Sequence, residues 1–153
     1  MPRSVLLLLI AILLLPAGAH AQAIQASGYV AVVPVATETI DLANGGSVLR
    51  QTFAGVTIAD DHDSVFHLTN QNCMFTTVLA ADGTMTVSNG FCDAVDSDGD
   101  VFGAWGHADA QGGNWRIIPG TGKFGDIAGG GTYGTAVSWP DGRSAIRWDF
   151  SSE

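Results

Sequence analysis

The segment Cys73–Cys92, CMFTTVLAADGTMTVSNGFC, decides the fold of this chain. Asp82-Gly83 at its centre is a strong signal for a two-residue turn, which predicts antiparallel strands on either side. In the register that this turn sets, apolar residues face apolar residues and Cys73 lies opposite Cys92. The expected pairs are Met74 with Phe91, Val78 with Val87 and Ala80 with Met85 on one face, and Thr77 with Ser88 and Phe75 with Gly90 on the other.

The hairpin also bears on the state of the two cysteines, which are the only ones in the sequence. Directly paired strand residues lie within reach of a disulfide bond, so the matched register predicts a bond between Cys73 and Cys92. Two free buried thiols are the alternative. An even number of cysteines in an exported protein favours the disulfide.

Short alternating segments separated by glycine-centred turns continue on both sides of this hairpin, and no helical periodicity accompanies them. The stretch WPDGR, Trp139–Arg143, predicts a second hairpin, because Pro suits the second position of a type I turn and Gly the left-handed position after it. Asn44-Gly45-Gly46 predicts a third turn. Further strands are expected near residues 35–42, 48–58, 64–69, 100–107, 115–118, 132–139 and 143–150.

About eight short strands in one chain predict an all-β sandwich or barrel. Glycines inside the strand-like segments favour an antiparallel closed barrel of lipocalin-like shape, because glycine permits the bends that closure requires. These glycines are Gly55, Gly90, Gly103, Gly106 and Gly134. A membrane-embedded barrel is the competing interpretation, but it would need longer strands with a continuous apolar outer band.

The first 21 residues have the pattern of a secretory signal peptide. Arg3 precedes the apolar run Val5–Leu15, and Ala19-His20-Ala21 forms a cleavage site before Gln22. The run has 11 residues, whereas a membrane-spanning helix needs about 20, so an uncleaved anchor is the less favoured alternative. We expect residues 1–21 to be removed and residues 22–153 to form one domain in the periplasm or outside the cell.

The charge balance limits the partners of this protein. Asp and Glu number 15 against 6 Lys and Arg, which gives a net charge of −9 at pH 7. Nucleic acids and anionic membranes are bound by clustered basic residues, so both are argued against as partners. The sequence predicts no membrane span after signal cleavage and no cofactor, and it does not indicate an oligomeric state.

The stretch Gly120–Gly125, GTGKFG, formally matches the G-x-G-x-x-G motif of dinucleotide-binding proteins. That motif requires a helix directly after it, whose N-terminus faces the pyrophosphate. The residues that follow, Asp126–Gly131, are DIAGGG, which disfavours a helix. A tight corner between strands is the favoured interpretation of this segment.

The same glycine-rich segment resembles the G-T-G-x-F/Y-x-G-I/A-x-G signature of the allene oxide cyclase-like and dirigent-like barrels. Its matching residues are Gly120, Gly122, Phe124, Gly125, Gly129 and Gly131. Exported bacterial members are similar in placing a cysteine and a D-x-D-G-D turn upstream, here Cys92 and Asp96–Asp100. The resemblance spans roughly residues 64–150 and implies an eight-stranded antiparallel barrel with an apolar interior. Plant members cyclise or orient reactive hydrophobic molecules by confinement, but none of their catalytic residues aligns with a position here.

Two acidic segments are candidates for metal sites. Asp96, Asp98 and Asp100 carry the hard oxygen ligands that Ca²⁺ prefers, but the spacing departs from the EF-hand pattern, and a turn is the favoured interpretation. His62 and His67 lie among the acidic residues of 60–63, without the spacing of a metal-binding motif. An exposed polar loop is the favoured interpretation there, and no metal is predicted.

Aromatic and polar residues of the later strands are the candidates for a ligand site. Trp105 and His107 share one face of a strand, and Tyr133 and Trp148 lie on two following strands. If they line the barrel, they supply an apolar wall with a few polar groups, which is the usual composition of a small-molecule pocket. Ordinary core filling beside an exposed Arg147 is the alternative.

Three functions remain open from the sequence. The favoured one is a module that binds a small hydrophobic ligand inside the barrel. The second is an isomerase or cyclase that confines an apolar substrate and uses His107, Tyr133 or Arg147 in acid–base steps. The third is an interaction protein whose barrel is filled and whose loops contact a partner. The sequence contains no serine-hydrolase elbow and no zinc-protease motif.

Overall fold

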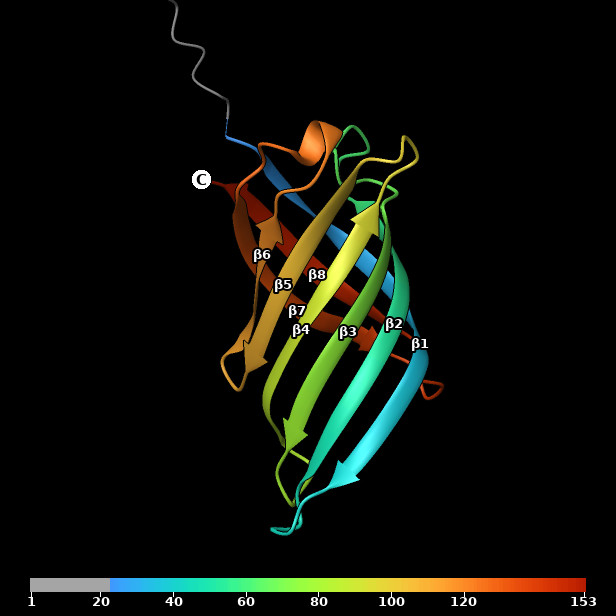
Figure 1. The fold of residues 1–153 in the computed structure, drawn as a ribbon, viewed down its shortest axis with the longest axis vertical. Coiled ribbons are helices and arrows are strands. Elements are labelled where there is room, and N and C mark those ends of the chain that lie inside the picture. The colour runs from blue at the N-terminus through green and yellow to red at the C-terminus, as the bar shows by residue number, and fades with distance from the viewer. Residues whose placement is uncertain (1–22) are drawn as a thin grey trace, which may run out of the picture.

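The structure, a computed structural model, describes residues 23–153. The predicted signal peptide at residues 1–21 lies outside the described residues. Eight antiparallel strands form one closed barrel in chain order, and the last strand pairs with the first (Figure 1). The strands are β1 (Gln25–Asp41), β2 (Ser47–Ala59), β3 (Asn70–Leu79), β4 (Met85–Val95), β5 (Val101–Asp109), β6 (Gly112–Ile118), β7 (Gly129–Ser138) and β8 (Ser144–Ser152). The predicted all-β closed barrel is confirmed.

The hairpin of β3 and β4 has the predicted register over most of its length. Cys73 lies opposite Cys92, and Met74 lies opposite Phe91. A register shift after Val78 places Met85 opposite Leu79. The predicted pairing of Met85 with Ala80 is therefore wrong by one residue, because a bulge next to the turn changes the count.

Residues 64–69 are not the predicted strand. They form a turn segment that crosses the end of the barrel and returns to β2, where the Leu68 amide donates to the Thr57 carbonyl at 2.9 Å. Leu68 has a φ of 58°, a left-handed conformation that no strand residue adopts. Phe66 is the apolar side chain that this turn segment buries, and it is 2% exposed. β1 also begins earlier than the prediction near residue 35, since its strand conformation starts at Gln25.

One end of the barrel is closed by side chains from two long connections. Phe66, between β2 and β3, and Phe124, between β6 and β7, are both buried. The ring centroid of Phe66 lies 5.0 to 6.4 Å from those of five other aromatic residues. The cluster at this closed end consists of Ala59, Phe66, Ala94, Phe102, Ile117, Phe124, Ile127, Trp148 and Phe150.

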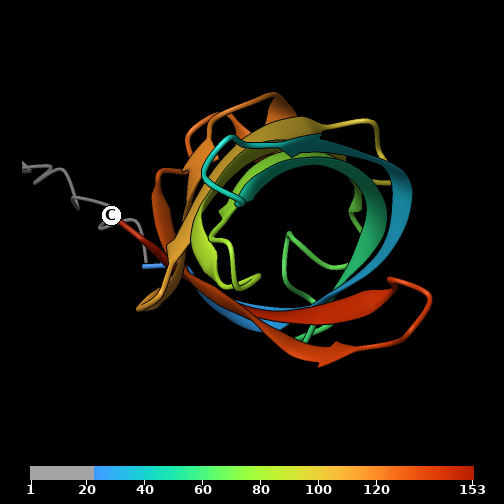
Figure 2. The same cartoon turned by 90° about the horizontal axis from the view of Figure 1, so that it is seen from below.

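The opposite end has only tight turns, and Figure 2 shows the strands arranged as a ring when the barrel is seen from below. Strands β1 to β4 extend beyond the other four at this end, because the pairing of β1 with β8 stops at Val32 and Ser144. The rest of β1, as far as Asp41, pairs with β2 alone. The barrel thus has a closed end and an open end.

The glycine motif lies at the closed end, where it forms a corner and a short 3-10 helix, Gly122–Phe124. A Cβ atom at Gly120 would lie 1.8 Å from the Val101 carbonyl oxygen, so only glycine fits against β5. This close approach positions Phe124, which is 0% exposed. The motif is therefore structural, as predicted. Within residues 23–153, no helix has the length and apolar character needed to cross a bilayer.

Candidate functional site

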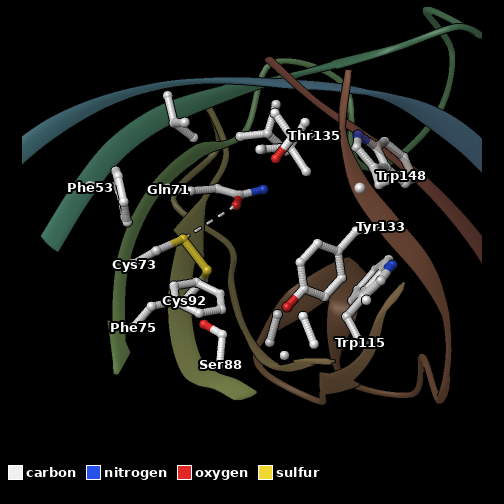
Figure 3. Close-up of a pocket in the computed structure, with 18 of the residues that line it drawn as sticks. Phe53, Gln71, Cys73, Phe75, Ser88, Cys92, Trp115, Tyr133, Thr135 and Trp148 are labelled. Carbon is white, nitrogen blue, oxygen red and sulfur yellow. Dashed lines mark hydrogen bonds between the residues drawn. A yellow bond between two sulfur atoms is a disulfide. The ribbon is translucent and has the colours of Figure 1, made fainter. Parts of the chain in front are cut away.

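A cavity of about 490 Å³ occupies the barrel between the aromatic cluster and the open end (Figure 3). Residues from all eight strands line it. Phe66, Trp115 and Trp148 form its floor, since they also belong to or pack against the closed-end cluster. Met85, Asp109 and Ser144 border it at the opposite end. The volume falls within the range of pockets that hold small organic molecules, about 300–1,000 Å³.

Glycines on the inner wall make space for two aromatic rings that would otherwise meet a side chain. A Cβ atom at Gly90 would lie 2.5 Å from the Phe75 ring, and one at Gly113 would lie 2.8 Å from the Tyr133 ring. Gly106 lies between them, and a Cβ atom there would be 3.3 Å from Phe75 and 3.4 Å from the Tyr133 hydroxyl oxygen. The two rings therefore lie against bare backbone, and the centre of the barrel remains open.

The predicted disulfide is present, and it lies on the inner wall. The Sγ atoms of Cys73 and Cys92 are 2.03 Å apart, and both residues line the cavity. The inner face of the hairpin is therefore the one that carries Phe75 and Thr77, and the more apolar face with Met74 points outward. The bond leaves no free thiol among the described residues. It is compatible with an oxidising compartment.

Several polar groups of the cavity wall bond to one another. The hydroxyl groups of Thr77 and Ser88 lie 2.8 Å apart. Gln71 donates through its side-chain amide to the Thr57 hydroxyl. The Gln71 carbonyl oxygen lies 3.9 Å from the sulfur of Cys73, which carries no hydrogen in a disulfide and so donates nothing. Within residues 23–153, this oxygen is therefore an acceptor without a donor.

Two further polar atoms on the cavity wall are buried without a hydrogen-bond partner among the described residues. They are the Tyr133 hydroxyl and the Trp148 Nε1. Burial raises the pKa of Tyr133 to about 12, so the phenol stays protonated at neutral pH. By contrast, the Nε1 of Trp115 donates to the Asp149 carbonyl at 2.8 Å. Tyr133 and Trp148 thus line the cavity as predicted, and each has a buried donor without a partner among the described residues.

His107 does not line the cavity, which corrects its prediction as a lining and catalytic residue. It lies on the outer face of β5, where Nδ1 is 2.9 Å from the side-chain oxygen of Asn89 and Nε2 is 3.7 Å from Asp109. The reason is the alternation of the strand, because Ala104, Gly106 and Ala108 occupy the inner positions.

Arg147 also lies outside, so it is excluded as an acid–base group of the cavity. Its guanidinium donates to both carboxylate oxygens of Asp60, at 2.6 and 2.9 Å, and lies 4.9 Å above the Tyr29 ring. The bonds from Arg147 and from Ser27 lower the pKa of Asp60 to about 2. This cluster joins the β2–β3 connection to the outer wall.

Trp105 and His107 share one face of β5, as predicted, and their rings stack with centroids 6.1 Å apart. The Trp105 side chain is partly exposed and lies beside Phe91 in an apolar strip on the outer wall. Across β3, β4 and β5, this outer strip consists of Met74, Phe91 and Trp105, which are 63%, 56% and 36% exposed. Trp105 is nonetheless among the residues that border the cavity, as predicted.

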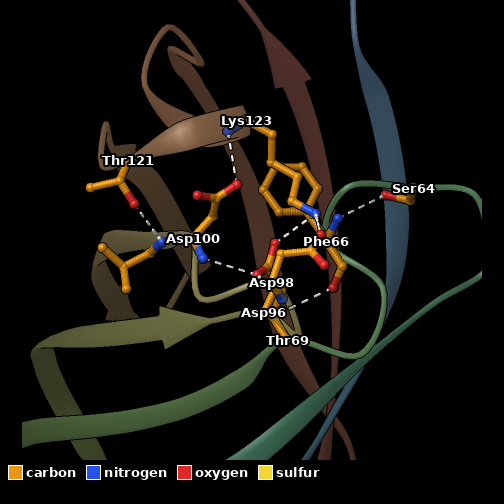
Figure 4. A network of polar contacts seen from close by, with 9 residues as sticks. Ser64, Phe66, Thr69, Asp96, Asp98, Asp100, Thr121 and Lys123 are labelled. Carbon is orange, nitrogen blue, oxygen red and sulfur yellow. Dashed lines mark hydrogen bonds and ion pairs between the residues drawn. The ribbon is translucent and has the colours of Figure 1, made fainter.

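The acidic turn between β4 and β5 binds a lysine (Figure 4). The Lys123 ammonium lies 2.6 Å from Asp96 and 3.0 Å from Asp98, and the Lys123 amide donates to Asp100 at 3.2 Å. These bonds lower the pKa of Asp96 and raise that of Lys123. In this structure, the calcium candidates Asp96 and Asp98 pair with the Lys123 ammonium, which attaches the glycine motif to the β4–β5 turn.

His62 and His67 stack on each other, with ring centroids 4.6 Å apart, over the closed end. Within residues 23–153, no group of three or more His, Cys, Asp or Glu side chains is arranged to hold a metal ion. The histidines contribute to the loop that positions Phe66.

Most of the inner wall, including Phe53, Gln71 and Phe75, was not predicted from the sequence. The positions of Gln71 and Phe75, each two residues from Cys73, were a usable signal, because residues two apart on a strand share a face. No protein-family model, curated protein or solved structure matches this chain. The resemblance to the allene oxide cyclase-like barrels stays a prediction.

Proposed function

We propose that this protein binds a small hydrophobic molecule in its barrel. The observation that carries the proposal is the cavity of about 490 Å³, which is closed by aromatic side chains at one end and accessible at the other. A barrel of eight strands has room either for a filled core or for one small ligand. Here, the glycines of the inner wall leave the space open.

Binding is favoured over acid–base catalysis by the chemistry of the wall. Among the residues that line the cavity, the ionisable ones are Tyr133 and Asp109, since the cysteines are bonded to each other. Tyr133 stays protonated, and Asp109 lies at the rim. An isomerase that moves protons needs a base beside the substrate, and His107 lies on the other side of the wall.

A fluorescence titration with N-phenylnaphthylamine, an uncharged apolar probe, tests the proposal. We expect saturable binding to the wild-type protein and a loss of at least about tenfold in Ala104→Trp, whose indole would fill the cavity. Thr135→Trp is a second blocking variant on β7. Thr76→Trp, which adds an indole to the outer wall, is the control and keeps full affinity.

Equal binding by all four proteins would contradict the proposal, because the probe would then occupy a site outside the barrel. Native mass spectrometry of protein purified from its own host identifies the natural ligand. We expect a small molecule that is released on unfolding, and repeated preparations without one count against the proposal.

A second candidate function is an interaction surface at the outer strip of Met74, Phe91 and Trp105. The exposed fractions of these side chains favour it, because adjacent large apolar residues on an outer wall are typical of contact surfaces. Met74→Ser with Phe91→Ser tests this candidate. Binding to a partner would fall while affinity for the probe in the cavity is retained.

A further inference from the structure

We infer that the ligand is an uncharged molecule that carries a hydrogen-bond acceptor, such as a ketone or ester oxygen, bound by Tyr133 and Trp148. This inference rests on the proposed binding function and specifies the chemistry of what is bound. Three independent features of the cavity wall support it: two unpaired donors, their position on neighbouring strands, and the absence of a counter-ion.

The two donors are the first feature. Trp148 is 6% exposed, and neither its Nε1 nor the Tyr133 hydroxyl has a partner among residues 23–153. A buried polar group without a hydrogen bond carries an energetic cost. A ligand acceptor that reaches either donor removes that cost, so such a ligand is preferred over a hydrocarbon of the same shape.

The position of the donors is the second feature. Tyr133 of β7 lies directly opposite Trp148 of β8, and both line the cavity (Figure 3). Trp148 belongs to the floor, whereas the Tyr133 hydroxyl extends toward Gly106 on the glycine-lined wall. The donors thus lie along one side of the cavity, which favours a ligand with acceptor oxygens on one edge.

The charge of the wall is the third feature. None of the described residues that line the cavity is Lys, Arg or His. Each Lys and Arg between residues 23 and 153 pairs instead with a carboxylate outside the cavity; these residues are Arg50, Arg116, Lys123, Arg143 and Arg147. A carboxylate held beside Tyr133 and Trp148 would be buried without a counter-ion, which is strongly unfavourable. An anionic group at this depth of the cavity is therefore disfavoured.

Three matched probes test the inference. The first probe, Prodan, is an uncharged naphthalene ketone. The second probe, called the propyl form, has a propyl group in place of the propionyl group of Prodan. The third probe has a carboxylate at the same position. We expect wild-type protein to bind Prodan about tenfold more tightly than the propyl form, and the carboxylate most weakly. Tyr133→Phe should weaken Prodan binding about five- to tenfold and leave the propyl form within about twofold.

Trp148→Phe is the second variant, and it should likewise weaken binding of Prodan more than binding of the propyl form. Near-ultraviolet circular dichroism checks that this variant is folded. Tyr29→Phe is the control, because it removes a phenol hydroxyl from the outer wall. Equal affinity for Prodan and the propyl form, unchanged by Tyr133→Phe, would overturn the inference and leave the binding function intact. Carboxylate binding as tight as that of Prodan would also overturn it. If no probe binds, or if Ala104→Trp has no effect on any of them, the binding function itself fails.

Discussion

The two ends of the barrel are built from the same strands and differ in their connections. At the closed end, long connections carry Phe66 and Phe124 into the interior, and both are nearly or fully buried. At the open end, tight turns carry no side chain into the interior, and the inner wall there borders a cavity. The difference indicates that stability is concentrated at one end, which frees the other for a ligand.

The largest expected effect is at the closed end. Phe66→Ala removes the ring that contacts five other aromatic residues, and should lower the free energy of unfolding by about 4 kcal/mol. Phe53→Ala removes a ring that already borders open space, and should cost about 2 kcal/mol or less. Urea denaturation measures both. Equal losses would contradict the division of the barrel into two ends.

The disulfide stabilises the wall of the cavity, so its removal should cause the second-largest loss in free energy of unfolding. Cys73 and Cys92 are separated by 19 positions in the sequence, and a loop of that size predicts a loss of about 3 kcal/mol when the bond is removed. The double variant Cys73→Ala with Cys92→Ala, compared with oxidised wild type by denaturation, tests this. A variant as stable as the wild type would show that the hairpin is held by its neighbours alone.

The glycines of the inner wall should give the next-largest effect. Gly90→Ala places a methyl group against the Phe75 ring, and the forced shift should cost about 1–3 kcal/mol and weaken probe binding. Gly134→Ala is the matched control, because no atom lies within 4 Å of its Cβ position. Thermal unfolding and the fluorescence titration distinguish the two variants. If Gly90→Ala behaves like Gly134→Ala, the glycines do not shape the cavity.

The smallest effect is on the outer wall, where Asp60 pairs with Arg147. The pKa of Asp60 is lowered from its ordinary value of 3.8 to about 2 by the Arg147 and Ser27 bonds. The folded state thus binds the proton less tightly than the unfolded state, so the pair stabilises the fold above pH 3.8 and this contribution is lost as the pH falls toward 2.

Asp60→Asn should therefore lower the melting temperature slightly at pH 6 and flatten its decline in acid. Asp126→Asn, which removes an exposed charge at the same end, is the control and should retain the wild-type profile. Identical acid profiles for Asp60→Asn and wild type would show that this pair adds no stability.

The fold was predictable where the pattern of the sequence is local. The Asp82-Gly83 turn sets the hairpin and the disulfide, because both depend on strand register alone. The inner face was harder to predict, since Met74 and Phe91 form the more apolar face and yet lie outside. In a barrel with an open cavity, the inner wall does not have to be the more apolar one.

The candidate site was predicted only in part for the same reason. Tyr133 and Trp148 were placed correctly, and Trp105 also borders the cavity, whereas His107 lies at an outward position of β5. The role of Phe66 could not be predicted from the spacing of apolar residues. A short strand and a turn that buries one aromatic side chain have the same short apolar pattern in the sequence. Only the contact with distant aromatic residues distinguishes them.

The two methionines on opposite faces of the wall provide the most direct test. Met85 borders the cavity, and Met74 is 63% exposed on the outer strip. In an NMR titration of isotope-labelled methionine methyl groups with N-phenylnaphthylamine, we expect the Met85 signal to shift to saturation while the Met74 signal stays unchanged. A shift of Met74 with Met85 unmoved would contradict ligand binding inside the barrel.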